Sequence, residues 1–134
     1  MNNSDKVVLV VEDNAANMKF FHAILDAHGY IVLQATDGME GWRMAREHRP
    51  ALILMDIQLP DISGLEVTKR LKEDETLKSI PVIAVTAFAM VGDEKKYLEN
   101  GCDGFISKPI SITDLLQTVE HFLDQPLAQA SAIR

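Results

Sequence analysis

The strongest constraint on the fold is a regular alternation of short apolar runs with longer amphipathic stretches. Five runs have the length of a buried strand: Lys6 to Val11, Ile31 to Ala35, Ala51 to Met55, Pro81 to Thr86 and Gly104 to Ser107. Five stretches between and after them have the apolar spacing of helices: Asn14 to His28, Asp37 to Glu47, Gly64 to Asp74, Val91 to Asn100 and Ile112 to Leu123. Continuous runs such as Val-Val-Leu-Val-Val indicate strands covered on both faces. The alternation therefore predicts an α/β protein, a parallel sheet between helical layers joined by right-handed crossovers.

Single residues mark the ends of several predicted helices. Gly29 and Gly101 follow the first and fourth helical stretches, where glycine commonly stops a helix. Asp37, Ser63 and Ser111 precede helical stretches and have the short polar side chains that cap the first turn.

The length of the chain predicts one domain. With 134 residues it can bury about two-thirds of the surface that its unfolded form exposes. The apolar spacing stops after Leu123, so we expect a domain over residues 1–123, a flexible tail over 124–134 and no output domain. The single Cys102 excludes an internal disulfide and suits a reducing compartment.

Composition argues against two classes of partner. No apolar run approaches the ~20 residues of a membrane span, and residues 1–6 are polar, so we expect a cytoplasmic protein without membrane contact. The net charge of -7 and the lack of a Lys and Arg cluster argue against nucleic acid.

Three acidic residues follow two of the apolar runs. Glu12 and Asp13 come directly after Val11, and Asp56 comes directly after Met55. Adjacent central strands of a parallel sheet end side by side, at the edge where open α/β folds bind ligands. Two ionised carboxylates ~4 Å apart repel by roughly 4 kcal/mol there, so a cation or protons must screen them. Oxygen ligands with open positions suit Mg²⁺, for which Mn²⁺ is expected to substitute.

The acids and a nearby carbonyl can be given separate roles. A strand-end carboxylate beside a cation can attack a phosphoryl group and hold it as an acyl phosphate, which makes Asp56 the expected nucleophile as well as a metal ligand. We expect Asp13 to bind the metal directly, Glu12 to hold a metal-bound water, and the carbonyl of Gln58 to add an oxygen. One such acid alone would be read as a solvated loop carboxylate or a helix cap. Three acidic residues at neighbouring strand ends favour a metal-binding phosphoacceptor site.

Two further side chains are expected at the same edge of the sheet. Thr86 ends the fourth run, and its hydroxyl could donate to a phosphate oxygen, although alone it is merely a β-branched strand residue. Lys108 follows the fifth run and could pair with a phosphate, whereas the simpler reading is a surface lysine. The following Pro109 favours the functional reading, because a cis peptide bond there would aim the ammonium across the sheet edge.

The residues at these strand ends resemble the signature of bacterial response-regulator receiver domains, the CheY-like family. The matching motifs are Glu12-Asp13, Asp56, Thr86-Ala87 and Lys108-Pro109. Their order and their placement on the expected elements make the resemblance specific, and it extends over residues 6–123. The runs at 54–60 and 86–90 are similar to stand-alone cell-cycle regulators of this family.

The resemblance implies both a fold and a function. The fold is a flavodoxin-like three-layer sandwich with five parallel strands in the order 2-1-3-4-5 and five helices. The function is that of a switch rather than an enzyme acting on other substrates. Asp56 would take a phosphoryl group from a histidine kinase or a histidine phosphotransfer protein, and the modified chain, a monomer or weak dimer, would bias downstream protein targets.

The family's switch involves Thr86 and an aromatic residue three positions before the lysine, which here is Phe105. We expect Thr86 to move toward the phosphoryl group and Phe105 to turn into the space it leaves. Phe105 lacks the polar tip of the tyrosine or histidine often found there, and it could simply be a half-buried strand aromatic. Gln58 and Phe88 carry no carboxylate to orient hydrolytic water, so we expect slow autodephosphorylation.

The first helical stretch is apolar over more of its circumference than a surface helix needs. Ala16, Asn17 and Phe20 lie next to the acidic site and could dock against a helix pair of a kinase. Additional core packing of Phe20 is the rival interpretation.

Three other functions share parts of this pattern. An aspartate-based phosphohydrolase needs a second aspartate two residues after the nucleophile, where this chain has Gln58. A flavin carrier binds a phosphate at the first loop, where Glu12 and Asp13 would repel it. A phosphorylation-independent interaction module remains open, because a receiver used only as a scaffold would have the same sequence.

Overall fold

The computed structural model describes residues 6–87 and 93–123 and contains one parallel sheet in the order β2-β1-β3-β4-β5. The strands are β1 (Val7–Val11), β2 (Ile31–Ala35), β3 (Leu52–Asp56), β4 (Val82–Thr86) and β5 (Gly104–Ser107). The predicted strand order is thereby confirmed. The tail expected at 124–134 lies outside the described residues.

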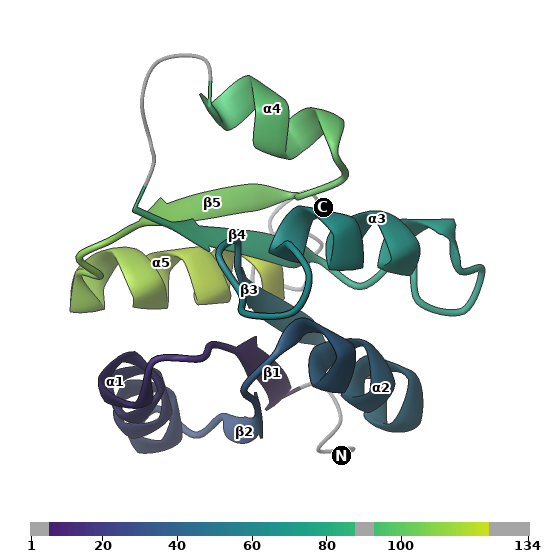
Figure 1. Ribbon diagram of the computed structural model, residues 1–134. Coiled ribbons are helices and arrows are strands. Elements are labelled where there is room, and N and C mark those ends of the chain that lie inside the picture. Colours follow the sequence, from purple (N-terminus) through teal and green to yellow (C-terminus); the bar gives the residue numbers. More distant parts are fainter. Residues whose placement is uncertain (1–5, 88–92, 124–134) are drawn as a thin grey trace, which may run out of the picture.

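Helices cover both faces of the sheet (Figure 1). They are α1 (Ala15–Ala27), α2 (Gly38–His48), α3 (Gly64–Glu73), α4 (Asp93–Glu99) and α5 (Ile112–Leu123). One buried cluster joins α1 and α5 to strand residues such as Val8 and Val10. A second cluster joins α2 and α3 to the alternate residues, such as Leu9 and Val11. Because successive side chains of a strand point to opposite faces, this division explains the continuous apolar runs and confirms the three-layer sandwich.

The fourth helix covers the β4 and β5 edge of the sheet. Tyr97 of α4 lies in a small buried cluster with Ala84 and Cys102, and Phe105 packs against it. The start expected for this helix, Val91, lies outside the described residues. In the part of the chain that the structure describes, no helix is both long and apolar enough to cross a membrane.

The predicted caps lie where the sequence indicates. The side chains of Asp37, Ser63 and Ser111 accept hydrogen bonds from backbone N–H groups of the first turns of α2, α3 and α5, at 2.8, 3.1 and 3.1 Å. Gly29 and Gly101 have φ angles of +89° and +101°, a backbone conformation that residues other than glycine rarely adopt. The three polar caps mark where loops at the carboxyl edge of the sheet end, and the two glycines mark where loops at the opposite edge begin.

Candidate functional site

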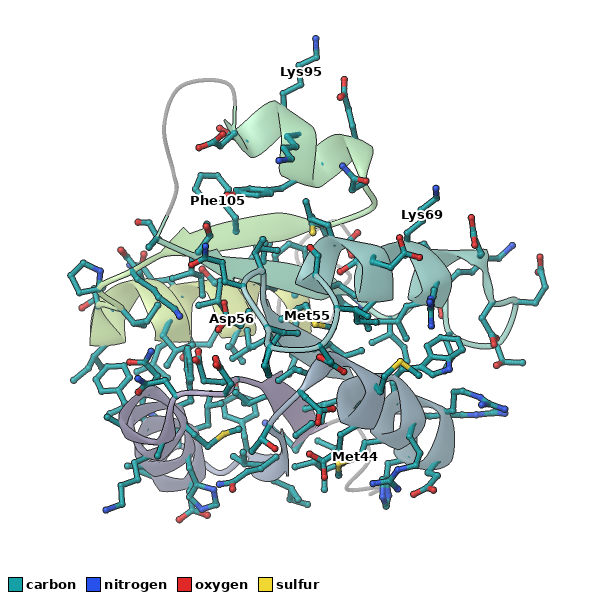
Figure 2. The ribbon with its side chains drawn as sticks, viewed as in Figure 1. Met44, Met55, Asp56, Lys69, Lys95 and Phe105 are labelled. Carbon is teal, nitrogen blue, oxygen red and sulfur yellow. The ribbon has the colours of Figure 1, made fainter. Side chains whose placement is uncertain are left out.

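The structure brings the three predicted acids together at the carboxyl edge of the sheet. Glu12 and Asp13 directly follow β1, and Asp56 ends the neighbouring strand β3. One carboxylate oxygen from each lies within 4.8 Å of the others. Glu12 and Asp56 are only 1% and 3% exposed, whereas Asp13 is exposed to solvent. Figure 2 shows Asp56 and its neighbour Met55 near the middle of the molecule, where the sheet separates the two helical layers.

Lys108 brings a positive charge to this cluster from the end of β5. Its Nζ lies 3.4 Å from Oδ2 of Asp56 and 3.5 Å from Oε1 of Glu12. The peptide bond between Lys108 and Pro109 is cis, as the sequence reasoning expected. One ammonium thus faces two buried carboxylates, and the interpretation as an ordinary surface lysine does not fit this geometry.

The electrostatics of Asp56 are unusual for a carboxyl group. Burial, followed by the charge of Glu12, raises the pKa of Asp56 from 3.8 to about 7. The backbone N–H of Gln58, which donates to Oδ1 at 3.0 Å, and the charge of Lys108 both act in the opposite direction. One lysine therefore does not offset the burial and crowding of the acids.

The two carboxylate oxygens of Glu12 have different surroundings. Its Oε2 accepts a hydrogen bond from the backbone N–H of Asn14 at 3.2 Å. Its buried Oε1 has no hydrogen-bond partner among the described residues. Buried oxygens in proteins are nearly always hydrogen-bonded, whereas this one forms an ion pair with the Lys108 ammonium at 3.5 Å without a hydrogen bond. A hard divalent ion such as Mg²⁺ fits a donor set made only of carboxylate oxygens with a solvent-exposed side.

The hydroxyl of Thr86 is directed toward the fourth helix. Thr86 ends β4 beside this site and is 2% exposed. Its Oγ1 lies 2.9 Å from the hydroxyl oxygen of Tyr97, with which it shares a buried hydrogen bond. The sequence reasoning missed Tyr97. The sequence signal at this position is a tyrosine among the charged residues of α4, but that signal does not indicate Thr86 as its partner.

Phe105 lies between β5 and α4, as Figure 2 shows. It is half-buried, and its ring centroid is 6.0 Å from that of Tyr97, with the planes at 52°. This placement is compatible both with a movable aromatic and with simple packing.

Two residues that follow β3, one in the loop and one at the start of α3, also shape the site, and the sequence reasoning gave neither a role in it. A side chain at Gly64 would collide with the backbone carbonyl of Asp56, so only glycine lets α3 begin so close to that carbonyl. The carboxylate of Asp61 accepts hydrogen bonds from the backbone N–H groups of Gly38 and Met39 at 2.8 and 2.9 Å. Asp61 thereby ties the loop next to Asp56 to the start of α2.

The predicted docking residues lie on α1. Phe20 is half-buried and packs against the core cluster, with its ring centroid 6.2 Å from that of Phe21. Ala16 is exposed and Asn17 is half-buried. Phe20 therefore contributes to the core and still presents part of its surface, so docking at this surface stays a prediction. Phe88, expected to affect hydrolysis, lies outside the described residues.

Comparison with known proteins identifies the family. A model of the response regulator receiver domain matches residues 8–120. The chain belongs to this family of two-component signalling domains, and the CheY-like resemblance is confirmed. The polar-differentiation response regulator DivK of Brucella anthropi is 55% identical over 118 residues, which cover 88% of this chain and 96% of that relative. This similarity agrees with the resemblance expected from the runs at 54–60 and 86–90.

Solved structures support the same fold. The receiver domain of the sensor histidine kinase PA1611 from Pseudomonas aeruginosa, solved with a magnesium ion coordinated in its active-site cleft, has a TM-score of 0.82 and 32% identity. The structural match covers 89% of this chain and 98% of the PA1611 receiver domain. The receiver domain of Ssk1, crystallised with the histidine phosphotransfer protein Ypd1 of Saccharomyces cerevisiae, has a TM-score of 0.82 and 27% identity, with 90% of each chain covered.

Proposed function

We propose that this chain is a Mg²⁺-dependent phosphoacceptor that switches protein interactions. Asp56 takes a phosphoryl group from a histidine kinase or a histidine phosphotransfer protein, and the modified domain, residues 1–123, binds downstream proteins differently. The observation that carries this proposal is the cluster in which Glu12, Asp13 and Lys108 surround the buried carboxylate of Asp56. The magnesium-containing receiver of PA1611 and the complex of Ssk1 with Ypd1 support the proposed metal and donor class.

The reaction uses one oxygen of Asp56 as the nucleophile. That oxygen forms a bond to phosphorus while the phosphorus–nitrogen bond of the phosphohistidine breaks, and the electron pair of that bond returns to the imidazole nitrogen. Lys108, already 3.4 Å from Oδ2, pairs with the charge of the transferred group. The N–H of Gln58 holds Oδ1 and so fixes the plane of the carboxylate.

The metal would be held by the side chains of Asp13 and Asp56, with Glu12 through a water and Gln58 through its carbonyl. When bound, Mg²⁺ neutralises the crowded carboxylates and draws negative phosphoryl oxygens into the site. The residues of this chain would bind the metal, orient the carboxylate of Asp56 and neutralise the charge of the phosphoryl group. Gln58 lies two residues after the nucleophile, where an aspartate-based phosphohydrolase has its acid, so we propose no turnover of other substrates.

Treatment with phosphoramidate, a small donor with a phosphorus–nitrogen bond, tests the proposal. We expect intact-mass spectrometry to show one phosphoryl adduct with Mg²⁺ present, none after EDTA, and none for Asp56→Asn. The variant Asp26→Asn, which removes an exposed carboxylate of α1, should be modified like the native chain. An adduct that forms equally on Asp56→Asn, or no adduct on a folded native chain, would favour a phosphorylation-independent interaction module.

A further inference from the structure

The hydrogen bond between Thr86 and Tyr97 connects the edge of the candidate site to α4. Both side chains are almost fully buried, at 2% and 3% exposed, and their hydroxyl oxygens lie 2.9 Å apart. Tyr97 also packs against Ala84 of β4 and Phe105 of β5. It therefore contacts the two strands that end beside Asp56 on the α4 side of the sheet.

Phe105 cannot take over the role of this hydroxyl. Its side chain has no polar atom, and its ring lies against the ring of Tyr97. The hydroxyl that faces Thr86 thus comes from the helix rather than from the strand. A movement of the Thr86 hydroxyl would therefore change this contact with α4.

Breaking this bond has a cost because both groups are buried. A buried hydroxyl that loses its partner is destabilised unless another partner replaces it. A phosphoryl group on Asp56 would offer Thr86 three strong acceptor oxygens. We expect Thr86 to turn away from Tyr97 to bond to them, which removes one buried hydrogen bond from the hydroxyl of Tyr97.

We propose that Tyr97 is a positioning residue that opposes activation of the site and carries the activated state to α4. This inference rests on the proposed function. In the unmodified protein, the Tyr97 hydroxyl holds Thr86 toward α4 and so raises the threshold for phosphoryl binding. After phosphorylation, the same hydroxyl loses Thr86, and α4 repacks around it.

The first test measures binding of beryllofluoride, a phosphoryl analogue, in the presence of Mg²⁺ by ¹⁹F NMR. Tyr97→Phe removes only the hydroxyl, and we expect it to bind beryllofluoride roughly 2- to 13-fold more tightly, the change that loss of one net hydrogen bond produces. Tyr30→Phe removes the same atom from the other tyrosine, which is 5% exposed and packs in the cluster of α1 and α5, and it should leave the affinity unchanged.

A double-mutant cycle then tests whether the effect passes through Thr86. In a Thr86→Val background, which lacks the hydroxyl, Tyr97→Phe should no longer change the affinity. In a Thr86→Ser background, which keeps the hydroxyl, the effect of Tyr97→Phe should persist. A role of Tyr97 in packing alone would change stability but would leave the affinities of this cycle additive.

The possible failures can be told apart. If the native chain does not bind beryllofluoride, or if Asp56→Asn binds it equally well, the proposed function fails and this inference falls with it. If the native chain binds it and Tyr97→Phe has the same or weaker affinity, only the inference is overturned. Urea unfolding of each variant, compared with Tyr30→Phe, verifies that the proteins compared are folded.

Discussion

Replacing Asp56 by asparagine should stabilise the metal-free protein, although the position lies at the centre of the candidate site. The folded pKa of Asp56 is about 7, compared with 3.8 for an ordinary aspartate, because burial and Glu12 disfavour its charge. A raised pKa of this kind contributes stability that is fully present below pH 4 and is lost as the pH rises through 7. The metal-free native protein should therefore become less stable between pH 4 and 7. Asparagine is isosteric, does not titrate and avoids this loss.

The size of the effect follows from the pKa difference. About 3 pKa units correspond to about 4 kcal/mol of differential interaction. The exposed Asp13 opens the site to water and dissolved ions, which screen part of this energy, so we take about 2 kcal/mol. Asp56→Asn should thus raise the free energy of unfolding by about this amount at pH 8 and by much less at pH 4, relative to the native chain.

Urea unfolding with EDTA at pH 8 and pH 4 measures the difference, with Asp26→Asn as the exposed control. Adding Mg²⁺ at 100 times its dissociation constant should stabilise the native chain by about 2.7 kcal/mol and affect Asp56→Asn much less. A variant less stable than the native chain at pH 8 in EDTA would refute the reasoning. So would an equal gain from Mg²⁺ in both proteins.

Further substitutions test other contacts of the site. Gly64→Ala should lower the free energy of unfolding by about 1–3 kcal/mol and weaken Mg²⁺ binding, because the added carbon displaces the backbone of Asp56. Thermal unfolding and Mg²⁺ titration measure both effects, and unchanged values would contradict the steric argument. Lys108→Ala should slow phosphorylation by phosphoramidate roughly 100-fold while Mg²⁺ binding persists, and an unchanged rate would exclude the proposed pairing. Gln58→Glu should hasten loss of the phosphoryl group at least about 10-fold in a decay assay, since it adds a carboxylate to orient water; rapid decay of the native chain itself would overturn the expectation of slow hydrolysis. Phe20→Ala should slow phosphotransfer from a kinase domain more than phosphorylation by phosphoramidate, and lower stability with an intact rate would mean that the ring serves the core.

Much of the fold could be predicted because its determinants are local. The apolar runs and their caps fix where strands and helices lie, and the right-handed crossover rule then fixes the layers. The remaining errors are at the edges. Asp56 was expected just beyond its strand, but it belongs to β3 because it pairs with Val85 of β4.

The acidic cluster was predictable for the same reason, since strand ends in a parallel sheet converge on one edge. Tyr97 was not, because its contact with Thr86 depends on how α4 is rotated on the sheet, and the charged sequence of this short helix does not determine that rotation. The contact of Asp61 with Gly38 joins residues far apart in the sequence. No local pattern indicates such a partner.

The most direct test of the central claim is chemical mapping of the phosphorylated residue. The chain is treated with phosphoramidate and Mg²⁺ and then with borohydride, which reduces an aspartyl phosphate to homoserine, and the peptides are sequenced by mass spectrometry. The account predicts homoserine at position 56 and at no other aspartate. Homoserine at another position, or an unmodified Asp56 in a chain that carries the phosphoryl group, would contradict it.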